Sequence, residues 1–246
     1  MATGGSSPIR GILFDKDGTL VDFNRTWFGI TMELAHQAAN GDEARARTLV
    51  EAGGYDWEME KFRGGSVVAA GTINDIVDLW HPELTLSEKR ERIRAYDEYA
   101  VREGSRRAVG IEGLRETLEA LVEHGYVLGI ATNDSEAGAR ATAEALGLTA
   151  LFKVIIGYDS VARAKPHADQ LHLFAARTGL APDVIAMVGD NAHDLEMAHA
   201  AGAGLAIGVL SGNSTLDDLG PLSDAILGSI AELPQYLEKR RAMPTP

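Results

Sequence analysis

Residues 12–20, Ile-Leu-Phe-Asp-Lys-Asp-Gly-Thr-Leu, decide how the rest of the chain is organised. The apolar run from Ile9 to Phe14 predicts a buried strand that ends in two carboxylates. Side chains two apart on a strand share a face, so Asp15 and Asp17 can converge on one site, and Gly18 lets the backbone turn sharply. Carboxylates held that close repel each other and favour a pairing cation such as Mg²⁺. An ordinary turn is the alternative, since Asp and Gly are common turn residues.

The composition bounds the class of protein. At 246 residues, with 45% apolar and 24% charged residues, the chain is long enough for one sizeable domain, or for one domain carrying an insertion. The net charge of −13 argues against nucleic acid and against an anionic membrane as partners. The absence of cysteine excludes disulfides, thiol nucleophiles and thiolate metal sites.

Neither a membrane-spanning helix nor a signal peptide is predicted from the sequence. No apolar run approaches the length of a transmembrane helix, and residues 1–8 lack the basic and apolar regions of a signal peptide. We therefore expect residues 1–8 to form a flexible tail and the protein to be cytoplasmic.

From residue 110 onward, apolar strands alternate with helices that glycines stop. Strands are predicted at residues 126–131, 152–156, 184–188 and 204–209, and helices at 113–124, 136–146, 167–178, 195–201 and 230–241. This alternation predicts an α/β fold with a parallel sheet covered on both faces.

The section from Phe23 to about Ser105 has a different character. Helical periodicity is predicted at residues 26–40, 43–52, 73–79 and 87–103, with no convincing strand between them. The opening strand therefore lacks an immediate helix-and-strand partner. We expect this helical section to be a separate unit, inserted between the first strand and the rest of the sheet.

Chemistry-bearing side chains follow the predicted strand ends. Because ligands bind at the carboxyl edge of an open α/β sheet, these residues are expected to share one active site. Each has a structural alternative: Thr132, Asp190 and Asp194 could cap helices, and Lys165 could be a solvated loop lysine. The set comprises Asp15, Asp17, Thr132, Asn133, Lys165, Asp190 and Asp194.

The ordered motifs Asp15-Lys16-Asp17-Gly18-Thr19, Thr132, Lys165-Pro166 and Gly189-Asp190-x-x-x-Asp194 resemble those of the haloacid dehalogenase-like hydrolase superfamily. The branch that the chain most resembles is the phosphoglycolate-phosphatase-like one. This resemblance implies a Rossmann-like doubly wound core at residues 9–21 and 108–241. It also implies an inserted all-helical cap at residues 22–107.

The resemblance implies a role for each acid. Asp15 would be the nucleophile that forms an aspartyl-phosphate, and Asp17 would act as general acid and then as general base. Asp15 and Asp190 would bind Mg²⁺ through carboxylates and Asp17 through its backbone carbonyl. Asp194 would support the metal through water or by pairing with Lys165.

The phosphate-binding residues are assigned in the same way. The Thr132 hydroxyl and the Asn133 backbone N–H would hold phosphate oxygens, while Lys165 offsets the charge that develops in the transition state. His193 is expected at the surface or behind the site. The function implied is hydrolysis of a small phosphorylated metabolite, such as phosphoglycolate or a sugar phosphate, by a monomer or homodimer.

The cap is expected to select the substrate. Candidate contacts are Tyr55, Trp57, Lys61, Arg63 and the turn at residues 64–66. The alternative is that the two aromatic residues belong to the core of the cap.

Several other functions remain open from the sequence. A phosphomutase would use the same residues, a dehalogenase would not need Asp17, and a phosphonate hydrolase would want a cap lysine such as Lys61 or Lys89. A phosphorylation-switch receiver would be much shorter and would lack a cap. A non-catalytic protein that binds a phosphate ester would be expected to have lost a motif residue, and none is lost here.

Overall fold

The computed structural model describes residues 8–242 of the chain. The tail predicted at residues 1–8 therefore lies outside the described residues, apart from Pro8. No helix in the described part of the chain is long and apolar enough to cross a membrane.

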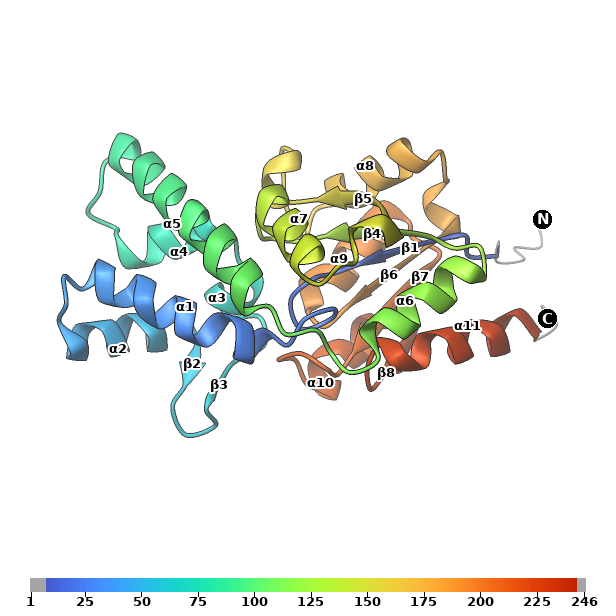
Figure 1. Ribbon diagram of the computed structural model, residues 1–246, viewed down its shortest axis with the longest axis horizontal. Coiled ribbons are helices and arrows are strands. Elements are labelled where there is room, and N and C mark those ends of the chain that lie inside the picture. The colour runs from blue at the N-terminus through green and yellow to red at the C-terminus, as the bar shows by residue number, and fades with distance from the viewer. Residues whose placement is uncertain (1–7, 243–246) are drawn as a thin grey trace.

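A parallel sheet of six strands forms the centre of the molecule, in the order β5-β4-β1-β6-β7-β8 (Figure 1). Strand β1 lies in the middle, with its Gly11 in register with Val127 of β4 on one side and Ile185 of β6 on the other. The strands are β1 (Gly11–Phe14), β4 (Val127–Ala131), β5 (Phe152–Ile156), β6 (Ile185–Gly189), β7 (Leu205–Val209) and β8 (Ala225–Leu227).

Helices cover both faces of this sheet, as the alternation of strands and helices predicts. Along β1, Ile12 and Phe14 are buried in one hydrophobic cluster and Leu13 in another, because successive side chains point to opposite faces. The first cluster includes residues of α6 (Leu114–Glu123), α7 (Glu136–Ala145) and α11 (Leu233–Ala242). The second includes residues of α8 (Asp169–Thr178), α9 (Ala192–Ala201) and α10 (Leu216–Leu219).

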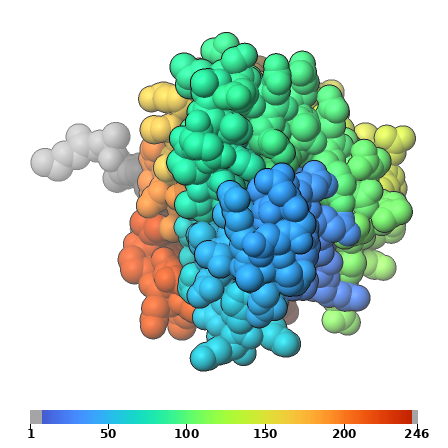
Figure 2. Space-filling view, turned by 90° about the vertical axis from the view of Figure 1, so that its left-hand side faces the viewer, coloured from blue at the N-terminus to red at the C-terminus, as the bar shows by residue number. Residues whose placement is uncertain are grey.

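Residues 22–107, here called the cap segment, lie at one end of the sheet (Figure 1) and fill the near face of the view in Figure 2. Their buried side chains form a third hydrophobic cluster, which includes Ile30, Leu34, Trp80 and Tyr96. The helices of the cap segment are α1 (Phe23–Ala38), α2 (Glu43–Ala52), α3 (Val67–Ala70), α4 (Ile73–Trp80) and α5 (Leu86–Arg107).

The two chain crossings between the core and the cap segment run side by side. The Asp22 N–H donates to the Val109 carbonyl at 2.8 Å, and the Ile111 N–H donates to the Leu20 carbonyl at 3.1 Å. The Asp22 carboxylate also accepts the Arg25 N–H at 3.0 Å and thereby caps α1. The chain thus turns directly from the opening motif into the first helix of the cap segment.

The structure adds elements that the sequence did not predict. A two-stranded antiparallel hairpin, β2 (Tyr55–Asp56) and β3 (Lys61–Phe62), lies within the otherwise helical cap segment. Its strands have two residues each, too short to produce a visible alternation. Strand β8 and helices α3 and α10 are also additions of three or four residues.

Candidate active site

The first motif lies at the carboxyl end of β1, in the middle of the sheet. Asp15 continues the strand pairing, since its N–H donates to the Val188 carbonyl at 2.8 Å. Asp15 is buried, and Gly18 follows with a φ of +87°, a backbone conformation that favours glycine. A Cβ on Gly18 would lie 2.5 Å from Asp190 Oδ2, so glycine also allows the close approach of the two motifs.

Lys165 is buried rather than solvated, which removes the alternative of a surface loop lysine. Its Nζ lies 2.6 Å from Asp15 Oδ1 and 2.6 Å from Asp194 Oδ1. Although burial opposes it, the pKa of Lys165 is raised above its usual value by the charges of Asp15 and Asp194. Lys165 is therefore a permanent cation that bridges two motifs.

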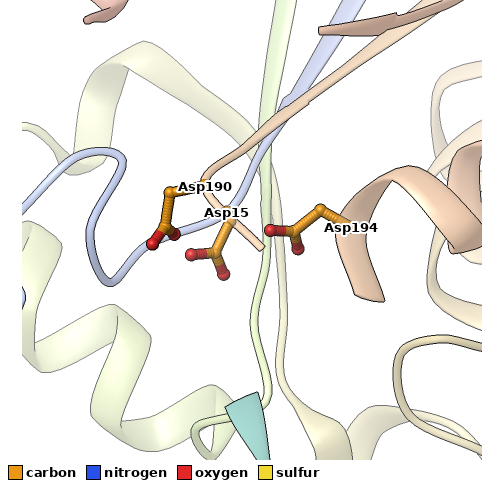
Figure 3. Close-up of side chains that lie close together, drawn as sticks. All are labelled: Asp15, Asp190 and Asp194. Atoms are coloured by element: carbon orange, nitrogen blue, oxygen red, sulfur yellow. The ribbon is translucent and has the colours of Figure 1, made fainter. Parts of the chain in front are cut away.

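Three carboxylates meet at the same edge of the sheet. Asp15, Asp190 and Asp194 are all buried, and one oxygen from each lies within 4.8 Å of the others. Figure 3 shows the Asp15 carboxylate between the other two. Oxygen ligands clustered in this way suit a hard cation such as Mg²⁺.

The electrostatics of this cluster also fit a cation. Burial, together with the charges of Asp194 and Asp17, raises the pKa of Asp15 to about 7 against the opposing charge of Lys165. Burial likewise raises the pKa of Asp190 well above its usual value, with Asp15 and Asp194 adding to the shift. Lys165 supplies one positive charge against three carboxylates, so the cluster is short of positive charge.

Asp190 is held by close backbone packing. Its Oδ2 accepts the Asn213 N–H at 3.1 Å, and its Oδ1 lies 3.5 Å from the Thr19 hydroxyl. A Cβ on Gly212 would lie only 1.8 Å from Asp190 Oδ2. The loop after β7 and the turn at Gly18 therefore both pack closely against this carboxylate.

The Asp194 carboxylate makes two contacts. One of them caps a helix, which is the alternative that the sequence left open. Helix α9 begins at Ala192, with Asn191 as its N-cap and Asp194 completing a capping box. Asp194 Oδ2 accepts the Asn191 N–H at 3.0 Å, while Oδ1 faces Lys165. Capping and pairing with the lysine are thus compatible.

Thr132 and Asn133 follow β4, and neither caps the next helix. The N-cap of α7 is Ser135, whose side chain accepts the Gly138 N–H. Buried Thr132 accepts the Asp134 N–H at 3.0 Å. The Asn133 side chain accepts the Lys165 N–H at 3.2 Å and donates to the Ala70 carbonyl of the cap segment at 2.8 Å. It therefore holds the loop that carries Lys165.

Asp17 faces the cap segment. Its Oδ1 accepts a hydrogen bond from Trp27 Nε1 of α1 at 2.6 Å, and its Oδ2 lies 2.6 Å from Lys16 Nζ. Lys16 is buried and also pairs with Asp134 at 3.1 Å. Despite the cost of burial, the charges of Asp17 and Asp134 raise the pKa of Lys16.

A pocket opens between the core and the cap segment, with all the predicted site residues except Asp190 in its lining. His193 also lines it; its Nδ1 is buried and has no hydrogen-bond partner among the described residues. His193 is therefore closer to the site than the sequence suggested.

The cap residues proposed from the sequence do not line this pocket. Tyr55 and Trp57 pack with Phe28 in an aromatic cluster, in agreement with the alternative of a cap core. Arg63 pairs with Asp56 at 3.7 Å. The cap side of the pocket is instead formed by helices α1, α3, α4 and α5.

Sequence reasoning missed several residues that face the pocket. Trp27 and Asp134 belong to the Asp17 network, and Asp97 of α5 accepts a hydrogen bond from Tyr158 Oη at 2.6 Å. The lysine between two acids in the first motif was a usable signal for a buried ion pair. Nothing local marks Asp97 or Tyr158, because they lie 61 residues apart in the chain.

Comparison with known proteins agrees with this geometry. The model of the haloacid dehalogenase-like hydrolase family matches residues 9–202. The phosphoglycolate phosphatase of Shigella boydii serotype 4 is 32% identical over 200 residues, covering 79% of each chain. That of Escherichia coli K12 is 30% identical over 207 residues, with the same coverage.

Solved structures share the fold. A predicted phosphoglycolate phosphatase from Haemophilus somnus 129pt has a TM-score of 0.71 at 24% identity, covering 94% of this chain and 99% of its own. CbbY from Rhodobacter sphaeroides, solved in complex with phosphate, has a TM-score of 0.65 at 22% identity, covering 92% and 96%.

The chain therefore belongs to the haloacid dehalogenase-like hydrolase family, in its phosphoglycolate-phosphatase-like branch. It is an enzyme, a hydrolase of the phosphatase type.

Proposed function

We propose that this chain is a Mg²⁺-dependent phosphatase that hydrolyses a small phosphate monoester through an aspartyl-phosphate. The observation that carries the proposal is the arrangement around Asp15. This buried carboxylate lines the pocket, contacts Lys165 at 2.6 Å, and has carboxylate oxygens of Asp190 and Asp194 within 4.8 Å.

In the proposed first step, a carboxylate oxygen of Asp15 forms a bond to phosphorus while the bond from phosphorus to the ester oxygen breaks. Asp17 donates a proton to the departing oxygen, which leaves as an alcohol. Covalent catalysis of this kind divides one difficult displacement into two easier ones.

In the second step, water attacks the phosphorus of the aspartyl-phosphate, and Asp17 takes a proton from that water. Phosphate is released and the Asp15 carboxylate is restored. The hydrogen bonds that Asp17 accepts from Trp27 and Lys16 support this role, because they fix the carboxyl group beside the pocket.

The phosphate oxygens would be held by the Thr132 hydroxyl, the Asn133 backbone N–H and Lys165. The Asn133 side chain is engaged with the Lys165 loop and with Ala70, which is consistent with its backbone N–H serving the phosphate. Removing one fixed hydrogen-bond donor that points at the charge developing in the transition state commonly lowers the rate by about 10²–10³.

The carboxylates suit a resident Mg²⁺. Asp15 and Asp190 would bind it directly, Asp17 through its backbone carbonyl, and Asp194 from behind through water or through Lys165. The raised pKa values of Asp15 and Asp190 support this assignment, since a divalent cation would offset their mutual repulsion. When bound, the ion would neutralise charge on the phosphoryl oxygens.

The substrate class is a small phosphorylated metabolite, with phosphoglycolate suggested by the relatives and a sugar phosphate as an alternative. We further propose a monomer or homodimer located in the cytoplasm. The net charge of −13 supports the exclusion of nucleic acid and of anionic membranes as partners.

The rival chemistries are less well supported. A phosphonate hydrolase would need a cap lysine in the site, but the only lysine among the described residues that line the pocket is Lys165 of the core. A dehalogenase would leave Asp17 without a role. A phosphomutase and a non-catalytic ester-binding protein make the same use of the phosphate site, and product analysis separates them from a phosphatase.

The test is hydrolysis of 4-nitrophenyl phosphate with Mg²⁺, with added chelator, and with the variant Asp15→Asn. We expect release of nitrophenol that requires the metal and is lost in the variant, whose circular dichroism should match that of the wild type. Activity retained by Asp15→Asn would refute the nucleophile assignment. Absence of hydrolysis for every ester in a panel of phosphorylated metabolites would refute the phosphatase.

A further inference from the structure

The part of the pocket formed by the cap segment is strongly apolar. Helices α1, α4 and α5 turn aliphatic and aromatic side chains toward it, most of them buried. The apolar residues on this side include Ile30, Leu34, Ile73, Ile76, Trp80 and Ala100.

Positive charge is confined to the core side of the pocket. Among the described residues that line it there is no arginine, and Lys165 is already paired with Asp15 and Asp194. Asn191 is the N-cap of α9 and His193 lies in its first turn, between Asp190 and Asp194 in the chain, so both lie at the phosphoryl end. Lys61 and Arg63, the cations of the hairpin, are not in the lining.

The cap side contributes negative charge instead. Asp97 of α5 lines the pocket and is fixed by the hydroxyl of Tyr158 at 2.6 Å. Asp134 lies close enough to raise the pKa of Asp97, although burial is the larger cause. A carboxylate on the leaving group would therefore meet an apolar wall, an acid and no free cation, and burying an unpaired charge is costly.

The cap segment offers a hydroxyl group few hydrogen-bonding side chains in this lining: Thr31, Thr72 and Asp97, since the indole N–H groups of Trp27 and Trp80 are already engaged. Thr72 lines the cap side, but its hydroxyl donates to Asp75 at 2.8 Å in the capping box of α4. A sugar carries several hydroxyl groups, each of which loses hydrogen bonds to water on entering such a site.

The direction of the leaving group follows from Asp17. Asp15 attacks phosphorus from one side, and the ester oxygen leaves on the opposite side. Asp17, which donates the proton to the ester oxygen, must lie on that leaving side. The Asp17 carboxylate is in turn bonded to Trp27 of α1. The carbon skeleton that follows the ester oxygen therefore enters the apolar part of the pocket.

We infer that the substrate is a phosphate monoester whose leaving group is uncharged and apolar, a short alkyl or aryl alcohol, and that the pocket discriminates against phosphoglycolate. This inference rests on the phosphatase chemistry proposed above. The inferred substrate differs from the phosphoglycolate that the relatives are named for. The difference lies in the leaving group, the part of the substrate that the cap segment contacts.

A matched pair of esters tests it. Isobutyl phosphate and phosphoglycolate have leaving groups of similar shape, with two methyl groups in the place of the two carboxylate oxygens. We expect kcat/KM to be at least about tenfold higher for isobutyl phosphate, a difference of about 1.4 kcal/mol. Calorimetric titration of the same two esters into Asp15→Asn measures the preference of the pocket without turnover.

A second comparison uses Asp97. In Asp97→Asn the like charge is removed, while an amide oxygen remains to accept the hydrogen bond from the Tyr158 hydroxyl. The ratio of kcat/KM for isobutyl phosphate to kcat/KM for phosphoglycolate should therefore fall severalfold. Glu98→Gln is the control, because Glu98 is the next residue of the same helix, is exposed, and does not line the pocket. In Glu98→Gln the ratio of kcat/KM for the two esters should equal that of the wild type.

The outcomes separate this inference from the phosphatase itself. Equal or faster turnover of phosphoglycolate overturns the inference and leaves the phosphatase intact. If no ester is hydrolysed but isobutyl phosphate binds Asp15→Asn more tightly than phosphoglycolate, the phosphatase fails and the apolar pocket stands. If neither ester binds, the inference is overturned.

Discussion

The indole Nε1 of Trp27 donates a hydrogen bond of 2.6 Å to the carboxylate of Asp17. Trp27 belongs to the first helix of the cap segment, whereas Asp17 belongs to the first motif of the core. The same carboxylate also contacts Lys16 at 2.6 Å. The group proposed as the proton donor is thus held from both sides of the interface between the core and the cap segment.

This contact makes Trp27 a positioning residue. In Trp27→Phe an aromatic ring remains but the donor is lost, and a hydrogen bond to a charged group is worth about 1.5–3 kcal/mol. We expect kcat to fall by about tenfold or more for an alkyl phosphate, whose leaving group needs a proton. For 4-nitrophenyl phosphate, whose leaving group departs readily as an anion, the fall should be smaller.

The control for Trp27→Phe is Trp57→Phe, an indole of the cap segment that does not line the pocket. The Trp57→Phe substitution should leave kcat for both substrates unchanged. If Trp27→Phe slows both substrates equally, the indole acts through general packing and not through proton donation.

Lys165 offers a second test, because it separates catalysis from stability. Removing its charge in Lys165→Met leaves Asp15 and Asp194 buried without their cation, a loss that typically costs about 3–5 kcal/mol. The rate should fall by about 10²–10³. Denaturant unfolding measures the first effect and 4-nitrophenyl phosphate hydrolysis the second.

Lys89→Met is the comparison for Lys165→Met. Lys89 pairs with Asp78 at the surface of the cap segment, where an ion pair is worth little. The free energy of unfolding of this variant should be within about 1 kcal/mol of that of the wild type, and its activity should be unchanged. A similar loss of stability in both variants would contradict the special position of Lys165.

How far the sequence predicts this site depends on the range of the interactions. The acids of the first and last motifs could be brought together from local pattern alone, because parallel strands place their carboxyl ends at one edge of the sheet. Pairing of Lys165 with Asp194 was one of two possibilities that the family resemblance implied, and in the structure the two side chains lie 2.6 Å apart. The equally short contact of Lys165 with Asp15 is a finding of the structure.

The pocket wall could not be predicted in the same way. Tyr55 and Trp57 were candidates for contact with the substrate, yet they pack against Phe28 inside the cap segment. Asp97 and Tyr158 meet only because α5 packs against the core, and no local pattern encodes that contact. Docking of one unit on another depends on side chains far apart in the sequence.

Metal binding should be visible in stability without any measurement of activity. A ligand that binds only the folded state stabilises it by about 2.7 kcal/mol at a hundredfold excess over Kd. We expect the Tm to rise with Mg²⁺ concentration and to return to its starting value on addition of chelator. Thermal unfolding followed by circular dichroism measures both changes.

Asp190→Asn is the informative variant for Mg²⁺ binding. It removes one of the three clustered carboxylates while its amide oxygen can still accept the Asn213 N–H. The apo variant should unfold at a temperature equal to or above that of the wild type, because one buried charge is gone, and it should respond less to Mg²⁺. An unchanged response would place the ion elsewhere.

Asp97 gives a prediction about pH. Burial raises its pKa to about 6 in the folded chain, above the usual value of 3.8. The folded state therefore binds more protons than the unfolded state between about pH 4 and pH 6, and the contribution of this group to stability falls as the pH rises through that window. Below about pH 4 the group is protonated in both states and costs nothing.

Asp97→Asn isolates this effect, since the other buried acids are the same in both proteins. At pH 7.5 the variant should be more stable than the wild type, by on the order of 1 kcal/mol after allowance for partial exposure. The difference should shrink toward zero as the pH is lowered to 4. Urea unfolding at several pH values measures it, with Glu98→Gln as control. A difference that is constant with pH would show that Asp97 does not titrate in this range.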